Sequence, residues 1–388
     1  MSAWVLPDHI ADLLPAQARQ VEILRRQLLD RAMVHGYELV TPPLLEHIES
    51  LLTGTGEALN LMTFKLVDQT SGRTLGLRAD TTPQVARVDA HLLNRPGVTR
   101  LCYCGPVAHA RAARAQATRE PLQFGAEIYG YAGREAEHEI QQLALDALRQ
   151  AGVSSLVMDC ADVRIVRALL QGQPIDASVA QAVHQALARK DVGQLASLTA
   201  ALAQPVRDGL RALPSLHGDI TVLERARTQL PSLPLITQAL EDLQALANGV
   251  QGAQVSFDLS DMRGYAYYTG LRFAVVGCLR DSGEPIELVR GGRYDEVGAV
   301  FGRSRPAVGF SLDVKELARA LPEAEAPRAI RAPWHDHAEL AQAIEALRQA
   351  GHVVICELPG HALGQDALVC DRELVQTPQG WQVQPLSS

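Results

Sequence analysis

The clearest strand in this sequence lies between residues 121 and 129 and carries polar groups on one side only. One face presents Leu122, Phe124, Ala126 and Ile128, and the other presents Gln123, Gly125, Glu127 and Tyr129. A half-buried strand ordinarily turns its polar face to water. The mid-strand glycine favours a second interpretation, because it often marks the close approach of a ligand or another chain segment. A carboxylate and an amide flanking that gap can grip a small polar molecule that carries hydrogen-bond donors.

Helices and further strands precede and follow this segment. Apolar residues at helical spacing predict one helix over residues 15–35 and another over 135–150. Residues 64–78 have the pattern of a hairpin that turns at Ser71-Gly72. A stretch rich in Ala, Leu and Gln, from about residue 171 to 250, predicts an all-helical insertion.

Strand character returns after the insertion. It is expected at residues 255–259 and from 265 to 276, where β-branched and aromatic residues concentrate, and a Gly-rich turn is expected over 290–295. Residues 322–327 have the composition of a linker. We therefore expect two domains, residues 1–320 and 328–388. The second is expected to hold a helix, a strand and a terminal hairpin over 368–383.

Composition and charge exclude several classes of protein. An apolar fraction of 47% with 21% charged residues describes a chain that forms a core. No apolar run reaches the length of about 20 residues that a bilayer crossing needs, and the first residues do not read as a secretory signal. A net charge of −8 without a long basic tract gives little support for nucleic-acid binding. Six cysteines without a CxxC pair fit reduced thiols in the cytoplasm.

Two other groups of residues stand out beside the strand. Residues 77–87 contain Asp80-Thr81-Thr82-Pro83, which is typical of a helix start with Asp80 or Thr81 as the cap. Residues 263–270 contain Arg263 and three tyrosines within four positions, in a chain with only 4% aromatic residues. A core-filling strand rich in aromatic residues explains this second group equally well, and neither group is specific alone.

Taken together and in this order, the groups resemble the class II catalytic domain of histidyl-tRNA synthetase. The matching motifs are its Arg-Pro-Glu-Gly-Thr segment, its Gln-x-x-x-Glu strand, its Arg-Gly-Leu-Asp-Tyr-Tyr signature and its Gly-Gly-Arg-Tyr-Asp turn, and the resemblance covers residues 5–320. It implies an α+β fold, with an antiparallel sheet flanked by helices, a helical insertion and a small truncated C-terminal α/β domain. Residues 37–46 are similar to the dimer-forming first motif of that class.

The resemblance also implies a pocket for free L-histidine. Asp80 and Thr82 would accept hydrogen bonds from the α-ammonium group, and Gln123 would hold the same end of the ligand. Glu127 and Tyr268 would meet the two imidazole nitrogens, Tyr267 would line the pocket, and Arg263 would face the carboxylate, a pairing that its charge and fork geometry favour. No cofactor and no metal ion are implied.

The motifs that bind ATP in that family are altered. In the second class II motif, Ala108 stands for the aromatic residue that stacks on adenine, His109 for an arginine, and Arg111 for a glutamate. In the third motif, Glu316 stands for an arginine. Adenylate formation needs cationic groups at the phosphates, so these changes predict a chain that does not form an adenylate. The segment 110–118 is expected to be a mobile loop or a partner contact.

The C-terminal part is too short for an anticodon-binding domain of that family. His335, His337 and His361 lie there without the spacing of metal ligands, which favours surface histidines. A synthetase-like chain with an amino-acid pocket but altered ATP motifs is similar to the regulatory subunits of ATP phosphoribosyltransferase, which act in the first step of histidine biosynthesis.

That similarity implies a non-catalytic chain that carries histidine feedback. The expected partners are the short-form ATP phosphoribosyltransferase catalytic subunit, L-histidine as effector, and a second copy of the chain, within a hetero-oligomer that is an octamer in characterised members. Neither nucleic acid nor a membrane is implied. Two alternatives stay open: a divergent enzyme that forms histidyl-adenylate, and a histidine sensor that acts on a partner outside this pathway.

Overall fold

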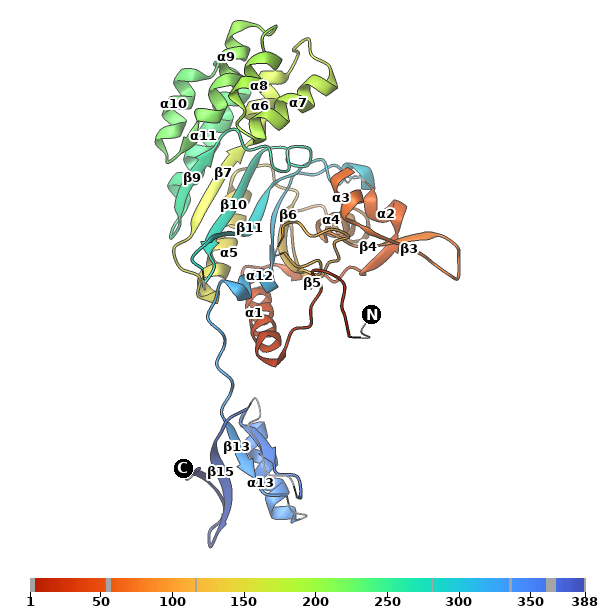
Figure 1. Ribbon diagram of the computed structural model, residues 1–388, viewed down its shortest axis with the longest axis vertical. Helices are drawn as coiled ribbons and strands as arrows, with labels where there is room; N and C mark the ends of the chain where they lie inside the picture. The colour runs from red at the N-terminus through yellow and green to blue at the C-terminus, as the bar shows by residue number, and fades with distance from the viewer. Residues whose placement is uncertain are drawn as a thin grey trace. The chain divides into compact units, whose positions relative to one another are not determined.

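The computed structural model describes residues 4–53, 57–115, 117–280, 282–334, 337–360 and 368–386. They form two compact units, one of Met1–Asp12 with Val21–Pro322 and the other of Leu13–Gln20 with Glu323–Ser388. The larger unit is built on a nine-stranded mixed sheet (Figure 1). Its strands run in the order β1 (Glu38–Leu39), β5 (Thr99–Pro106), β6 (Leu122–Tyr129), β12 (Ala307–Asp313), β11 (Pro285–Arg293), β10 (Leu271–Cys278), β7 (Val157–Asp162), β9 (Gln254–Asp258) and β8 (His217–Gly218).

Helices cover one face of this sheet. Val21, Leu24 and Leu28 of α1 (Pro15–Val34) belong to the same buried cluster as Ile140 and Leu143 of α5 (Glu135–Ala151). The apolar face of β6 meets them, as its alternation predicts, because Phe124, Ala126 and Ile128 are each at most 1% exposed. The helix α12 (Val314–Arg319) follows β12 directly. This face is the core, so the opposite face of the central strands is left for the site.

The first connection forms a small layer of its own. A three-stranded sheet has the order β2 (Leu45–His47), β4 (Thr74–Leu77) and β3 (Phe64–Val67), and the turn of the predicted hairpin lies between β3 and β4. Short helices accompany it, namely α2 (Ile48–Leu52), α3 (Glu57–Met62) and α4 (Thr82–Arg87), with a π-helical segment at Val88–Leu93. Helix α4 begins where the Asp-Thr-Thr-Pro sequence predicts, with Thr81 as its N-cap.

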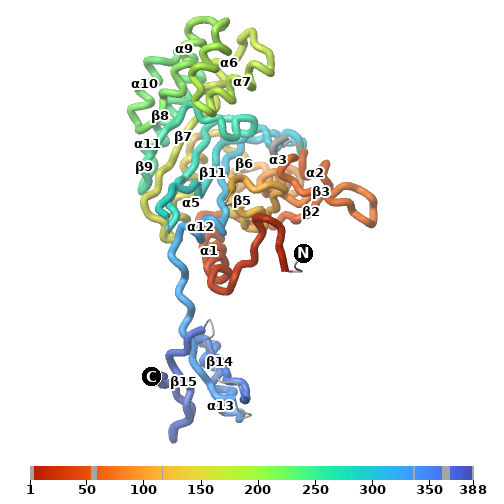
Figure 2. Tube along the Cα trace, in the orientation of Figure 1, coloured from red at the N-terminus to blue at the C-terminus, as the bar shows by residue number. Residues whose placement is uncertain are grey.

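The predicted insertion is helical except for one short strand, and its helices gather at one end of the sheet (Figure 2). It contains α7 (Ala177–Ala188), α8 (Val192–Leu198), α9 (Gln204–Ala212), a 3-10 turn at Leu213–Ser215, α10 (Thr221–Gln229) and α11 (Pro234–Gly249), and α6 (Val163–Leu170) directly precedes it. The exception is β8, whose two residues pair with β9.

Two expectations on either side of β10 are wrong. Residues 261–270 form a loop rather than a strand, and β10 begins only at Leu271. Gly264 has φ +69, which a regular strand does not accommodate. The expected turn at residues 290–295 is largely strand, since β11 continues to Arg293, and a 3-10 turn follows at Ala299–Phe301.

The smaller unit contains a four-stranded sheet and one helix. The strands have the order β14 (Val353–Cys356), β13 (Ala329–Ala332), β15 (Cys370–Thr377) and β16 (Gly380–Pro385), and the helix is α13 (Ala338–Gln349). The predicted helix, strand and hairpin are present, and β13 is the strand before the helix. His335 and His361 lie outside the described residues.

Candidate functional site

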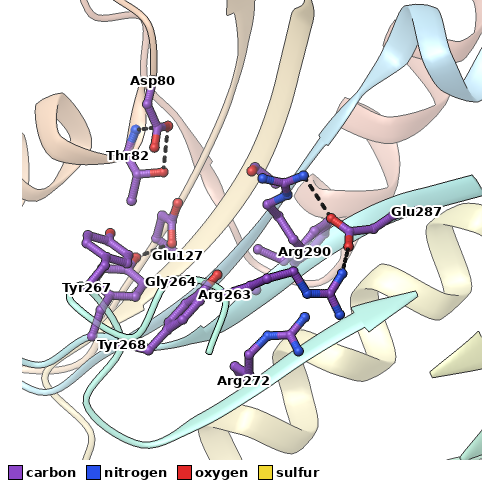
Figure 3. Close-up of a pocket in the computed structure, with 15 residues that line it drawn as sticks. Asp80, Thr82, Glu127, Arg263, Gly264, Tyr267, Tyr268, Arg272, Glu287 and Arg290 are labelled. Atoms are coloured by element: carbon purple, nitrogen blue, oxygen red, sulfur yellow. Dashed lines mark hydrogen bonds and ion pairs between the residues drawn. The ribbon is translucent and has the colours of Figure 1, made fainter. Parts of the chain in front are cut away.

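A cavity of about 230 Å³ opens on the face of the sheet opposite α1 and α5, where Val85 and Ala86 of α4 also pack. Six of the seven predicted site residues line it, and Figure 3 shows them around a common hollow. These six are Asp80, Thr82, Glu127, Arg263, Tyr267 and Tyr268. Pockets for drug-sized ligands usually measure about 300–1,000 Å³, so this cavity suits a ligand no larger than an amino acid.

Glycines make the hollow in the sheet. Strand register places Glu127 beside Gly309, and Gly309 beside Gly292, in one row across β6, β12 and β11. The next row runs from Tyr103 through Gly125 to Ser311. A β-carbon on Gly309 would collide with the Glu127 carboxylate, and one on Gly125 with the Tyr103 phenol. The glycine in β6 therefore makes room for another side chain, one of the two possibilities that the sequence left open.

Asp80 and Thr82 lie at one end of the cavity, where helix α4 begins. The Asp80 Oδ1 atom accepts hydrogen bonds from the Thr82 N–H at 3.0 Å and the Thr82 hydroxyl at 3.1 Å. Gln123 does not line the cavity and lies behind this loop. Its Nε2 donates to Asp80 Oδ1 at 2.8 Å, and its Oε1 accepts from the Thr81 N–H at 2.9 Å. Gln123 therefore contacts the loop that presents Asp80.

Glu127 is the buried acid of the site, with 1% of its surface exposed. The Tyr103 hydroxyl donates to its Oε1 at 3.1 Å, and the Tyr294 hydroxyl donates to its Oε2. Burial raises the pKa of Glu127 to about 8, although these two hydroxyl donors oppose the shift. A buried carboxyl group with a pKa near 8 suits an imidazole ring as a partner, because the imidazole ordinarily titrates near pH 6.5 and both groups change charge close to neutral pH.

The tyrosine loop closes another side of the cavity. The Tyr267 ring stacks on Tyr294, with 5.0 Å between centroids, and its hydroxyl oxygen is buried without a hydrogen-bond partner among the described residues. Tyr268 packs against Gly264, where a β-carbon would collide with its ring. The loop thus needs both its tyrosines and its glycine in this arrangement, which explains why the aromatic residues cluster in sequence.

Arg263 lies at the opposite end from Asp80, among acidic side chains. Its Nη1 donates to Glu287 Oε2 at 2.7 Å, and its Nη2 donates to Asp261 Oδ2 at 2.7 Å and to Asp159 Oδ2 at 3.4 Å. Its Nε donates to Asp261 Oδ2 at 3.0 Å. Arg263 therefore lines the cavity as predicted, but each guanidinium nitrogen already has a carboxylate partner.

The positions that would bind nucleotide phosphates in the synthetases have other partners. His109 makes a 2.9 Å hydrogen bond through Nε2 to the Ala79 carbonyl, and burial lowers its pKa, which favours the uncharged ring. Glu316 forms ion pairs with Arg114 and, at 3.0 Å, with Arg319. Arg111 is exposed. Arg114 belongs to the segment 110–118, of which residue 116 lies outside the described part. This segment therefore contacts Glu316, the residue that stands for the third-motif arginine.

Three residues of the site had no role in the sequence interpretation. Tyr103 and Tyr294 hold the Glu127 carboxyl, and Arg290 lines the cavity. Two of them, Arg290 and Tyr294, belong to residues 290–295, which the sequence predicted to be a turn. Tyr103 lies on β5, the strand before β6, and only the strand register, which pairs it with Gly125, shows that it faces Glu127.

A second cavity, of about 860 Å³, lies between α5, α11 and the start of β10. Its buried charges are matched internally, because Arg293 pairs with Glu137 and Arg164 pairs with Asp242 at 2.8 Å. We assign no ligand to it.

Comparisons with known proteins bear on both parts of the chain. The family described as histidyl-tRNA synthetase matches residues 9–317, and the C-terminal domain of the ATP phosphoribosyltransferase subunit HisZ matches residues 327–384. A protein of Variovorax paradoxus named ATP phosphoribosyltransferase regulatory subunit is 60% identical over 390 residues, covering 100% of both chains. The chain belongs to the family of ATP phosphoribosyltransferase regulatory subunits. A regulatory subunit of this family from Paraburkholderia xenovorans is 55% identical over 99% of this chain and 100% of its own.

Solved structures agree with this family and its fold. A Bacillus halodurans protein described as an ATP phosphoribosyltransferase regulatory subunit/histidyl-tRNA synthetase superposes with a TM-score of 0.81 and 27% identity, covering 95% of this chain and 100% of its own. Histidyl-tRNA synthetase from Nostoc sp. has a TM-score of 0.75 at 16% identity, covering 97% and 92%, which shows the shared fold alone. The class II synthetase-like fold predicted from the motifs is confirmed. Among the described residues, no helix is long and apolar enough to cross a membrane.

Proposed function

We propose that this chain binds free L-histidine in the cavity around Glu127 and transmits that binding to ATP phosphoribosyltransferase as feedback inhibition. The chain is a non-catalytic regulatory subunit of that enzyme in histidine biosynthesis. The proposal assigns the effector site to Asp80, Thr82, Glu127, Tyr267 and Tyr268, with Gln123 holding the Asp80 loop. Residues 1–320 form the histidine-binding domain in this proposal, and residues 328–388 form a separate small domain.

The match between cavity and ligand supports the assignment. An amino acid offers an ammonium group at one end, and Asp80 lines that end of the cavity, where Thr82 and Gln123 orient its carboxylate by donating to Oδ1. The imidazole ring needs partners for two nitrogens, and Glu127 and Tyr268 both line the hollow. A site that hydrogen-bonds both ring nitrogens rejects rings that lack them, because its buried polar groups are then left unpaired.

Calorimetry on the full chain tests the effector. We expect L-histidine to bind and L-phenylalanine, whose ring is attached at the same position but has no nitrogen, to give no measurable heat.

Pyrophosphate exchange with ATP in the presence of histidine tests the alternative that the chain forms an adenylate. We expect no exchange, because Glu316 is tied to arginines and His109 to a backbone carbonyl. Histidine-dependent exchange would contradict the proposal.

The proposed assembly is a dimer of this chain combined with the short-form catalytic subunit into a hetero-octamer. The support is the name that its relatives carry and the likeness of residues 37–46 to the dimer-forming motif. We expect the tagged chain to retain the catalytic subunit on an affinity column and to raise its activity. We place the complex in the cytoplasm, where the six free thiols of the chain stay reduced. Failure to retain the catalytic subunit would leave a histidine sensor with another partner.

A further inference from the structure

Two arginines on the cationic side of the cavity, Arg263 and Arg290, differ in how many carboxylate partners their guanidinium groups have. Arg263, which the synthetase signature assigns to the ligand carboxylate, gives all three guanidinium nitrogens to carboxylates of Asp159, Asp261 and Glu287. A guanidinium satisfied in this way gains little from another carboxylate, because it must first release one that it holds.

Arg290 has more of its charge available. Its Nη2 lies 2.9 Å from Glu287 Oε1, and this is its one ion pair within the part of the chain that the structure describes. Its side chain is 71% exposed, while it also lines the cavity. The fork of Nε and Nη1 is therefore available to a bidentate carboxylate.

A β-bulge puts Arg290 on the ligand face. The register of β10 with β11 shifts between Val275 and Val276, so that Val275 pairs with Val289 while Val276 pairs with Glu287. The extra residue, Leu288, changes the phase of the alternation, and Glu287 and Arg290 come to lie on the same face. Without the bulge, one of the two would point into the core.

The position of Arg290 also fits the third group of the ligand. It pairs with Ser311, which continues the row of Tyr103 and Gly125, next to the row of Glu127 and Gly309. Burial raises the pKa of Tyr268, and the positive charge of Arg290 opposes that shift, so the guanidinium acts on the ring that the ligand would touch. Figure 3 shows Asp80, Glu127 and Arg290 on different sides of one hollow.

We propose that Arg290 binds the carboxylate of L-histidine, exchanging part of its contact with Glu287 for the ligand, and that Arg263 holds the loop of the tyrosines instead. This inference rests on the proposed histidine site. It assigns the ammonium, imidazole and carboxylate of the ligand to three separate elements: the start of α4, the strand β6 with the tyrosine loop, and the bulged strand β11.

The test compares L-histidine with L-histidinol, in which an alcohol replaces the carboxylate, by calorimetry on the full chain. We expect Arg290→Gln to weaken histidine about ten- to a hundredfold, as for a lost charge-assisted hydrogen bond, and to change histidinol less than about twofold. Arg263→Gln serves as the matched control, and it is expected to weaken both ligands alike by loosening the loop.

The outcomes separate this inference from the proposed function. If neither ligand binds the unaltered chain, the histidine site itself is wrong. If histidine binds and Arg290→Gln leaves it unchanged, or weakens both ligands equally, the role of Arg290 is overturned. A loss confined to histidine in Arg263→Gln, but not in Arg290→Gln, would return the carboxylate to Arg263. Because Arg290 is largely exposed, circular dichroism of the variant is expected to match the unaltered chain.

Discussion

Glu127 is the residue whose chemistry depends most on its surroundings. It is completely buried between two tyrosine hydroxyls, and burial raises its pKa from 4.5 to about 8. In the free chain, its proton is therefore retained at neutral pH. A ligand that brings an imidazole next to this carboxyl adds a second group that exchanges a proton in the same pH range.

The raised pKa predicts how stability changes with pH. Between about pH 4.5 and pH 8, the folded chain holds a proton on Glu127 that the unfolded chain releases. Stability rises with pH only where the unfolded state binds more protons, so here the contribution of Glu127 falls as the pH rises, by up to about 1.4 kcal/mol per pH unit. Urea unfolding without histidine at several pH values is expected to show a shallower loss for Glu127→Gln. Parallel curves for the two chains would contradict the raised pKa.

The same residue is expected to control ligand affinity. Glu127→Ala removes the acceptor for an imidazole N–H and the carboxyl group to which the Tyr103 and Tyr294 hydroxyls donate, so histidine affinity measured by calorimetry is expected to fall at least about tenfold. The fold and the oligomeric state are expected to persist, because the Glu127 carboxyl is uncharged at neutral pH and takes part in no ion pair within the described part of the chain. Glu120→Ala, on an exposed acid two residues before the same strand, is the control. An unchanged affinity would remove Glu127 from the site.

The glycine-bearing strands are the elements that make the cavity. In β12, a methyl group on Gly309 would occupy the space of the Glu127 carboxylate. Gly309→Ala is expected to lower the free energy of unfolding by about 1–3 kcal/mol, as overpacking does, and to displace the acid from the ligand. Gly97→Ala is a matched control, because nothing lies within 4 Å of a β-carbon there. Equal stabilities of the two variants by urea unfolding would show that Glu127 moves aside freely.

Elements with a regular period could be predicted from the sequence. The helices α1 and α5 follow from apolar spacing, β6 from its alternation, and the two hairpins from their turn residues. Six of the seven residues that the family motifs assign to the site line one hollow, and their contacts with histidine stay a prediction. Local pattern sufficed wherever a segment's own side chains decide its conformation.

Segments whose conformation depends on distant partners were predicted less well. The three tyrosines favour a strand by propensity, yet the backbone at Gly264 and the acids around Arg263 hold a loop. The glycines at 291 and 292 suggested a turn, but they lie in β11 where neighbouring strands leave no room for a β-carbon. The bulge at Leu288 that orients Arg290 appears only in the register. Each of these causes is a contact or a strand pairing with a distant part of the chain, which the pattern of neighbouring residues does not indicate.

At the scale of the whole molecule, feedback requires that histidine distinguish two states of the complex. A ligand changes an equilibrium only by its difference in affinity for the states, and the coupling between two binding events is the same in both directions. The cavity is joined to the rest of the larger unit by β11 and β12, the central strands of the nine-stranded sheet. Histidine binding and docking of the catalytic subunit are therefore expected to affect each other by one common factor.

That reciprocity can be measured as a closed cycle. Histidine affinity is determined by calorimetry with the chain alone and with the catalytic subunit in excess, and the affinity between subunits is determined with and without saturating histidine. We expect the two ratios to agree, and we expect a factor of about 5 to 150, the range typical of allosteric coupling. Glu127→Ala, which is expected to weaken histidine binding, is expected to bind the catalytic subunit normally while making its activity less sensitive to histidine. A ratio of one in both directions would mean that histidine bound in this cavity does not regulate the enzyme, whatever its affinity.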